Sequence, residues 1–240
     1  MAKRFYKEAV VSPADRNFWQ VRLDGKAVKT PTGKALAVPV ESLARRIRDE
    51  WGAQKDEIIP QTMPVTRLVG VALERADTRD ALVGDIRAYA STDLLSYRKD
   101  SPDDFVARQS AAFDPLLDWA SGKGIALRTT TGLLAIEQDP LSLDRMAEYA
   151  GMLKDIPLTL LAHLTATYGS AIVALAVLHG RLEAGEAYDL SRLDDIYRAE
   201  TWGRDEEAEE RAAAIRAETV AMAAMLPDLT IPPLDFPAAL

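Results

Sequence analysis

The chain contains no cysteine, which excludes disulfide bonds, thiolate metal sites and a cysteine nucleophile. Histidine is almost as scarce, because only His163 and His179 are present to supply imidazole. The sequence also lacks glycine-rich phosphate loops and the H-E-x-x-H and G-x-S-x-G patterns of hydrolases. These absences leave the chain poorly supplied with residues for catalysis, for cofactor binding and for metal binding.

Positive charge is in the minority, with 29 Lys and Arg against 37 Asp and Glu and a formal net charge of −8. Nucleic-acid binding requires clustered cations, so we expect no nucleic-acid partner. The charge is unevenly spread: residues 1–34 carry eight Lys or Arg against three acids, whereas residues 181–218 carry twelve acids against six Arg. Solvated faces often have such an asymmetry, and it would also steer an oppositely charged protein partner.

Targeting and membrane signals are weak. The first residues, MAKRFYKEAVV, contain neither an apolar signal core nor a long Arg- and Ser-rich presequence, so we expect a cytoplasmic protein without an import presequence. Residues 156–180 are uncharged and long enough to span a bilayer. However, this run contains Pro157, His163 and several threonines and has no basic flank of the positive-inside kind. A helix buried on all sides of a bundle gives the same pattern, so we expect no membrane insertion.

The first forty residues predict β-structure. Apolar and polar residues alternate over 19–23, and Asp24-Gly25, a strong hairpin signal, follows directly. Two further short runs, 26–30 and 35–38, flank a second turn at Pro31-Thr32-Gly33. Together they predict a meander of three short strands.

From Ser42 onward the spacing of apolar residues becomes helical. Leu43, Ile47 and Trp51 lie four apart, on one face of a helix that Gly52 could end. The prolines within 59–64 then predict a linker and a domain boundary.

Two more helices are expected before residue 125. The first is an amphipathic helix over 82–97, and the second has its N-cap at Ser101 with proline at the first turn. Pro115 should kink or restart this second helix, and Gly122 or Gly124 should end it.

A separate β-signal over 125–136 predicts a hairpin in an otherwise helical region, because Thr131-Gly132 forms a turn between two apolar runs. Helices resume after Pro140, and the last one, over about 205–226, combines an apolar stripe with an acidic beginning. The expected fold is α+β: a small N-terminal β-meander domain with one helix, residues 1–62, followed by a larger, mostly helical domain with one β-hairpin, residues 63–240.

The acidic cluster Asp205, Glu206, Glu207, Glu209 and Glu210 is the best candidate for chemistry, since paired carboxylates can do acid–base work or hold a divalent ion. Metal ligands usually converge from several elements, whereas these residues share one or two helical turns. Acids at a helix N-terminus and on a solvated face also account for the cluster. A carboxylate-based, metal-dependent enzyme and a partner-binding surface therefore both stay open.

Trp202 lies beside Gly203, between a charged stretch and the last helix. An exposed aromatic side chain flanked by carboxylates would serve as an anchor in a protein interface. A core position is the competing interpretation.

Several strings of residues, in order along nearly the whole chain, are similar to those of one known family. They are Arg4-Phe5-Tyr6-Lys7, Leu23-Asp24-Gly25-Lys26, Lys29-Thr30-Pro31, Glu50-Trp51-Gly52-Ala53-Gln54, Ile59-Pro60, Met63-Pro64-Val65-Thr66, Tyr89-Ala90-Ser91-Thr92-Asp93-Leu94-Leu95, Arg108-Gln109, Asp114-Pro115-Leu116, Ser191-Arg192-Leu193-Asp194-Asp195, Glu200-Thr201-Trp202-Gly203 and Asp205-Glu206-Glu207-Ala208. In this order they resemble the family of assembly chaperones for the alpha subunit of F-type ATP synthase.

The resemblance implies a small β-domain followed by a helical domain, with no catalysis and no cofactor. It implies that the chain binds unassembled alpha subunit and shields its subunit interface until beta subunit replaces it. Its partner-binding residues would be Glu200, Trp202, Asp205, Glu206 and Glu207. A general holdase without a dedicated client and a membrane-associated adaptor are the alternatives beside the metal-dependent enzyme.

Overall fold

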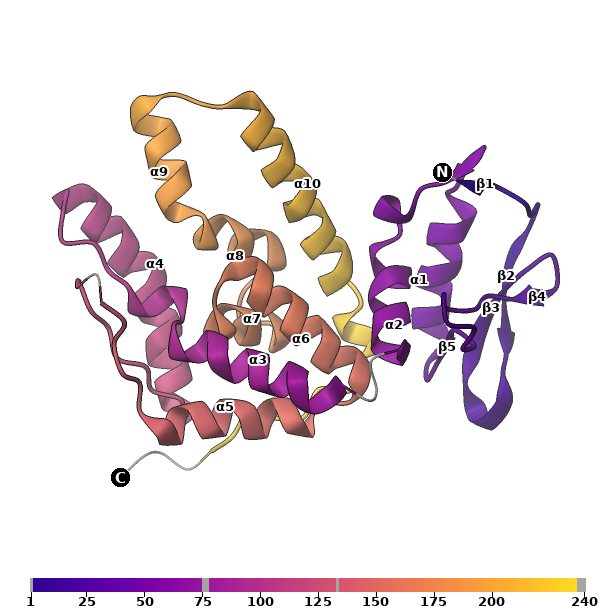
Figure 1. Cartoon of the computed structure of the whole chain (residues 1–240), viewed down its shortest axis with the longest axis horizontal. Helices are drawn as coiled ribbons and strands as arrows, with labels where there is room; N and C mark the ends of the chain where they lie inside the picture. The colour runs from indigo at the N-terminus through magenta and orange to yellow at the C-terminus, as the bar shows by residue number, and fades with distance from the viewer. Residues whose placement is uncertain (1, 75–77, 133, 237–240) are drawn as a thin grey trace. The chain divides into compact units, whose positions relative to one another are not determined.

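The structure, a computed structural model, describes residues 2–74, 78–132 and 134–236. The chain divides into two compact units, which we call unit 1, residues 1–79 with 224–230, and unit 2, residues 80–223 with 231–240. The strands of the described residues belong to unit 1, and unit 2 is mostly helical (Figure 1). This confirms the predicted α+β fold class, a small sheet region followed by a larger helical part.

Unit 1 is built around the central strand β3. Its elements are β1 (Ala2–Lys3), β2 (Ala9–Pro13), β3 (Trp19–Leu23), β4 (Lys26–Ala27), β5 (Ala37–Val38), α1 (Glu41–Gly52), β6 (Glu57–Ile58) and α2 (Pro64–Glu74). Strand β3 pairs antiparallel with β2 on one side and with β4 and β5 on the other, while β1 pairs with β6.

The predicted hairpin at Asp24-Gly25 is confirmed. Leu23 pairs with Lys26, and Asp24 and Gly25 have φ angles of 46° and 82°, the left-handed conformation that a tight two-residue turn requires. Alternate residues of β3 are buried on the face that α1 covers, with Val21 at 0% and Leu23 at 5% exposure. Helix α1 begins and ends within one residue of its predicted bounds and buries Leu43 and Ile47.

The proline-rich stretch read as a linker contains the start of α2. Pro64 is the first residue of this helix, where its missing N–H costs nothing. Glu50 of α1 caps the same helix end by accepting hydrogen bonds from the backbone N–H groups of Val65 (2.8 Å) and Thr66 (2.7 Å). The division at residues 62 and 63 stays a prediction, and it falls between two helices that pack together in unit 1.

Residues 224–230 return to unit 1 after the last long helix. Arg46 of α1 forms an ion pair with Asp228 of this segment.

Unit 2 consists of helices joined by short turns and one long irregular segment. Its helices are α3 (Arg79–Ser91), α4 (Asp103–Gly122), α5 (Pro140–Met152), α6 (Asp155–Tyr168), α7 (Ala171–Leu178), α8 (Ala184–Ser191), α9 (Leu193–Trp202) and α10 (Glu206–Ala223). The uncharged run 156–180 forms α6 and α7, which Gly169 separates with a φ angle of 64°. Every residue of α7 is buried, so this run supplies the core of unit 2. No helix among the described residues has the length and apolar character needed to cross a membrane.

A buried carboxylate shapes the region after α3. Asp93 is fully buried and accepts hydrogen bonds from the N–H of Leu95 (3.0 Å), the hydroxyl of Ser170 (2.7 Å) and the N–H of Ile172 (3.1 Å). These bonds hold the 3-10 turn Leu94–Ser96 against the N-terminus of α7. The predicted helix over 82–97 is therefore too long, because α3 ends at Ser91.

The third predicted helix differs from expectation at its beginning and in its middle. Helix α4 begins after Pro102 without a side-chain cap, since the hydroxyl of Ser101 donates to Asp100 instead. It continues through Pro115 and ends at the predicted Gly122.

The hairpin predicted over 125–136 contains no paired strands among its described residues; Leu133 lies outside them. One isolated bridge joins Thr130 to Tyr97. The side chain of Gln138 takes the place of a partner strand, because its carbonyl accepts from the N–H of Arg128 (2.7 Å) and its amide donates to the carbonyl of Arg128 (3.1 Å).

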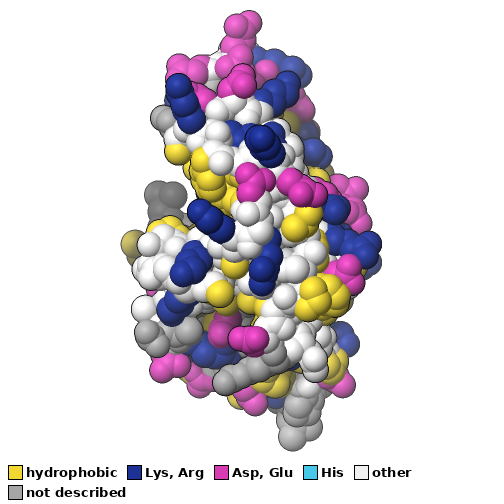
Figure 2. All heavy atoms as spheres, turned by 90° about the vertical axis from the view of Figure 1, so that its right-hand side faces the viewer, with side chains coloured by type: hydrophobic (Ala, Val, Ile, Leu, Met, Phe, Trp, Pro, Cys, Tyr) yellow, Lys and Arg dark blue, Asp and Glu magenta, His cyan; other side chains and the backbone are white. Residues whose placement is uncertain are grey.

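The two units carry opposite charge. Unit 1 contains 15 Lys and Arg against 11 Asp and Glu, whereas unit 2 contains 14 against 26. Figure 2 shows a face on which hydrophobic side chains lie in patches among Lys and Arg side chains.

Candidate partner-binding site

A hollow of about 680 Å³ lies between α9 and α10, and we call it the α9–α10 hollow. Figure 1 shows the two helices side by side, joined at one end by a short extended connection, residues 203–205. The lining is partly apolar and partly charged: Arg192, Asp195, Ile196, Arg198, Ala199, Glu200, Trp202, Gly203, Arg204, Asp205, Ala208, Glu209 and Ala212.

Helix α9 is fastened to α4 along one face. The rings of Tyr197 and Phe105 lie 4.7 Å apart between centroids, and the Tyr197 hydroxyl donates to the carboxylate of Asp104 at 3.0 Å. One turn further on, both Nη atoms of Arg108 donate to the carboxylate of Glu200, at 2.6 and 3.3 Å. Tyr197 therefore faces α4 and does not line the hollow, Ile196 and Ala199 line it, and Glu200 both contacts α4 and lines the hollow.

Arg108 and Glu200 each stabilise the charged form of the other. The hydrogen bonds from Arg108 lower the pKa of Glu200, and those to Glu200 raise the pKa of Arg108. The carboxylate is therefore ionised at neutral pH.

Trp202 is the last residue of α9 and has 77% of its surface exposed. Gly203 follows with a φ angle of 104°, a conformation that other residues rarely adopt, and its N–H bonds to the carbonyl of Ala199 (3.1 Å). The chain thus leaves the helix at Gly203, and the indole remains at the rim of the hollow. The alternative that Trp202 lies in the core is wrong.

The first three acidic residues at the beginning of α10 each have a different environment. Asp205 caps the helix, because its carboxylate accepts from the N–H groups of Glu207 (3.1 Å) and Ala208 (3.2 Å). Glu207 forms an ion pair with Arg211 one turn later, at 2.9 Å. Glu206 is exposed.

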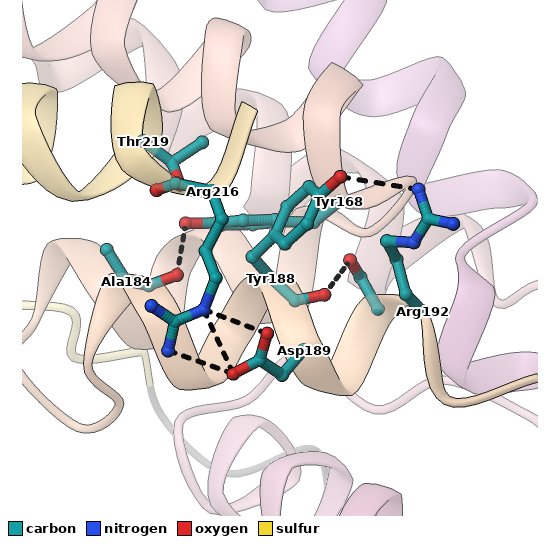
Figure 3. A network of polar contacts seen from close by, with 8 residues as sticks. Tyr168, Ala184, Tyr188, Asp189, Arg192, Arg216 and Thr219 are labelled. Atoms are coloured by element: carbon teal, nitrogen blue, oxygen red, sulfur yellow. Dashed lines mark hydrogen bonds and ion pairs between the residues drawn. The ribbon is translucent and has the colours of Figure 1, made fainter. Parts of the chain in front are cut away.

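Helix α10 is anchored mainly through its second half, where Thr219 and Met222 are its buried residues. The guanidinium of Arg216 binds both carboxylate oxygens of Asp189 in α8, with an Nε–Oδ1 distance of 2.9 Å (Figure 3). It lies so close to α8 that a Cβ atom on Gly185 would be 2.7 Å from its Nη2 atom. Ahead of this anchor Ile215 is 40% exposed, and Ala208 and Ala212 are half-buried.

The structure brings together three of the five predicted partner-binding residues. Glu200, Trp202 and Asp205 line the α9–α10 hollow, while Glu206 and Glu207 lie just outside its lining. Sequence reasoning missed Arg108, which orients Glu200 from a helix 92 positions away. The only sequence signal was its presence in one of the family-like strings.

The remaining candidates for chemistry are the acidic cluster and the histidines. Among the described residues, no three His, Asp or Glu side chains are grouped so that they could hold a metal ion. His179 is hydrogen-bonded through Nε2 to the hydroxyl of Tyr149 at 2.7 Å, and burial lowers the pKa of its imidazole.

An exposed tryptophan beside an open hollow with apolar and charged walls is typical of surfaces that bind another protein. The fold and this site together define a two-unit α+β protein with an exposed hollow of apolar and charged residues on its helical unit.

Comparisons with known proteins identify its family. The model of the ATP12 chaperone protein family matches residues 3–121. The crystal structure of Atp12 from Paracoccus denitrificans is 39% identical and has a TM-score of 0.86, covering 94% of this chain and 97% of that one. A protein of Agrobacterium tumefaciens is 38% identical with a TM-score of 0.89, covering 95% of this chain and 85% of that one. The mitochondrial protein atp12 of Schizosaccharomyces pombe is 25% identical over 224 residues, which are 82% of this chain and 77% of that protein.

The chain therefore belongs to the ATP12 chaperone family. This membership confirms the resemblance drawn from the sequence and, with it, the role of a chaperone in the assembly of ATP synthase.

Proposed function

We propose that this chaperone binds unassembled alpha subunit of the F-type ATP synthase through the α9–α10 hollow and shields its subunit interface until beta subunit replaces it. The observation that carries the proposal is Trp202, an indole with 77% of its surface exposed at the rim of a hollow to which α10 contributes the small apolar residues Ala208 and Ala212. A large exposed aromatic side chain in such a place is the usual energetic centre of a protein interface.

The charged residues around Trp202 would set orientation and association rate. Glu200, Asp205, Glu206 and Glu207 all carry carboxylates at the end where α9 and α10 are joined, so a client surface with exposed Lys or Arg would meet complementary charge. Because Glu200 and Glu207 already have arginine partners within the chain, each client contact exchanges one ion pair for another. The net affinity would be moderate, as a chaperone that must release its client requires.

The proposal includes no chemical step. Binding and later displacement by beta subunit account for shielding without a cofactor or nucleotide. We also propose that the chain acts in a bacterial cytoplasm, which its similarity to proteins of P. denitrificans and A. tumefaciens supports.

Co-migration with purified alpha subunit on a sizing column tests the function. A complex is expected with alpha subunit, and it should weaken when Glu206 and Glu207 are both changed to Gln. Addition of beta subunit should release the chaperone. Purified beta subunit alone and an unrelated aggregating protein are the controls.

The outcomes separate this function from the alternatives. Equal binding to the unrelated protein would indicate a general holdase. Absence of a complex with alpha subunit at micromolar concentrations would refute the proposal.

A further inference from the structure

Unit 1 has a second surface with the character of a binding site. Its positive charge is concentrated in residues 1–34, which carry eight Lys or Arg against three acids. One of these acids, Asp24, is engaged within the chain, where its carboxylate accepts from the N–H groups of Lys7 (3.1 Å) and Glu8 (2.9 Å). The sheet of unit 1 is thus the basic counterpart of the acidic helices in unit 2.

A hollow of about 580 Å³ lies on the outer face of this sheet, opposite the face that α1 covers, and we call it the sheet hollow. Because side chains alternate along β3, Gln20 and Arg22 lie on the opposite face of the strand from Val21 and Leu23; Gln20 is itself buried, with 8% exposure, and Arg22 is half-buried. The other lining residues are small or apolar with one acid: Pro13, Ala14, Asp15, Phe18, Ala35, Ala37 and Leu73.

The turn between β2 and β3 presents an aromatic side chain at the rim of the sheet hollow. The N–H of Ala14 bonds to the carbonyl of Phe18 at 2.7 Å and closes the turn. Asn17 adopts a left-handed conformation with a φ angle of 62°, which asparagine tolerates better than most residues. Phe18 follows directly and is 40% exposed.

Arg22 is the charged group of the sheet hollow, and its hydrogen-bonding capacity is largely unused. Its Nη1 atom makes one long bond to the carbonyl of Gly25, at 3.4 Å, and its buried Nε–H has no hydrogen-bond partner among the described residues. No carboxylate of the described residues pairs with it, whereas Arg45 and Arg108 each have one. A guanidinium binds a carboxylate in two-pronged fashion, and because Nε is buried, an acidic side chain from outside the chain would bind the two terminal Nη atoms of this half-buried side chain.

We propose that the sheet hollow is a second client-binding surface, which takes an extended acidic segment by placing an apolar side chain against Phe18 and a carboxylate on Arg22. The inference rests on the proposed function, because the occupant is a segment of the same client. The excess of positive charge in unit 1 and the unpaired guanidinium select an acidic occupant. The small residues Ala35 and Ala37 leave room for its backbone next to the sheet.

The test measures the dissociation constant of the full chain for purified alpha subunit, with substitutions in the sheet hollow. Arg22→Gln should weaken binding about tenfold and Arg22→Glu further, and Phe18→Ala should weaken it by a similar factor. Arg45→Glu, which makes the same change of charge on the exposed side of α1, is the matched control and should have little effect. Thermal unfolding of each variant checks that the fold is intact.

The outcomes distinguish this inference from the proposed function. Absence of any wild-type complex refutes the function itself. A wild-type complex that Phe18→Ala and both Arg22 variants leave unchanged overturns only the sheet hollow. Equal weakening by Arg45→Glu and Arg22→Glu would mean that overall charge alone acts, and it would overturn the inference as well.

Discussion

Replacement of Trp202 by alanine is the sharpest test of the α9–α10 hollow, because the indole contributes little to the fold. With 77% of its surface exposed, Trp202 makes few contacts that folding would lose. Substitutions of exposed residues usually change the free energy of unfolding by less than about 0.5 kcal/mol. The variant should therefore fold and unfold like the wild type.

The same exposure sets the effect on binding. A buried tryptophan side chain covers roughly 200 Å². About three quarters of this area is free before the client binds, and at ~25 cal/mol per Å² its burial is worth at most about 4 kcal/mol. Association costs and imperfect packing reduce this value, so we expect a loss near 2 kcal/mol, as for other interface hot spots. The dissociation constant for alpha subunit should rise about thirtyfold.

Isothermal titration with purified alpha subunit measures this change. Tyr89→Ala is the matched control, since Tyr89 is an exposed aromatic residue of α3, 38% exposed, and does not line the hollow. Wild-type affinity in Trp202→Ala would refute the reasoning. So would an equal loss in Tyr89→Ala, because exposed aromatic surface in general would then drive the binding.

Two further predictions concern the stability of unit 2. Burial raises the pKa of Asp93 to about 6, so the folded state holds a proton that the unfolded state releases, and stability falls as pH rises from about 4 to 6. Asp93→Asn removes this dependence. In denaturant titrations, the unfolding free energy of the wild type relative to that of the variant should fall by up to about 3 kcal/mol between pH 4 and pH 7. A difference that stays constant with pH would contradict the buried ionisation. Gly185→Ala should displace the guanidinium of Arg216 and speed amide exchange in the first half of α10, with no gain in stability. Gly84→Ala in α3, where a Cβ atom meets nothing within 4 Å, should stabilise the chain by about 0.5–1 kcal/mol, and an equal gain in both variants would contradict the close contact at Gly185.

Elements with local signals were predictable from the sequence. The hairpin at Asp24-Gly25 depends on two residues that tolerate left-handed φ angles, and α1 depends on a four-residue repeat of apolar side chains. Gly122 ends α4 as expected. In each case the residues that decide the structure are neighbours in sequence.

Errors arose where a distant residue decides the local structure. The linker predicted over 59–64 includes the first residue of α2, because the cap of this helix is Glu50 of another helix, which no local pattern reveals. The irregular segment over 125–136 was read as a hairpin, although Gln138 satisfies the backbone of Arg128 in place of a second strand. The end of α3 was misplaced because Asp93 bonds to the start of α7.

The candidate site was half predictable for the same reason. Glu200, Trp202 and Asp205 are close in sequence and were named together, and the structure places them around one hollow. Arg108 orients Glu200 from α4, and the Asp189–Arg216 pair holds α10. These contacts join residues far apart in the chain, so they required the structure.

Helices α9 and α10 form the two walls of the α9–α10 hollow. The way in which they are attached to the rest of unit 2 affects how a chaperone can hold a client and still release it. Helix α9 is tied to α4 through a ring contact and exposed polar groups, and α10 is tied to α8 behind Arg216, so little apolar surface is buried between the walls themselves. The charged groups of the walls are already paired within the chain, which means that client charges gain little net energy by replacing those pairs. Charge would then govern orientation and rate, while Trp202 and the small apolar residues of the lining would supply most of the affinity. An interface of this kind binds tightly enough to shield the client and weakly enough for a second subunit to displace it.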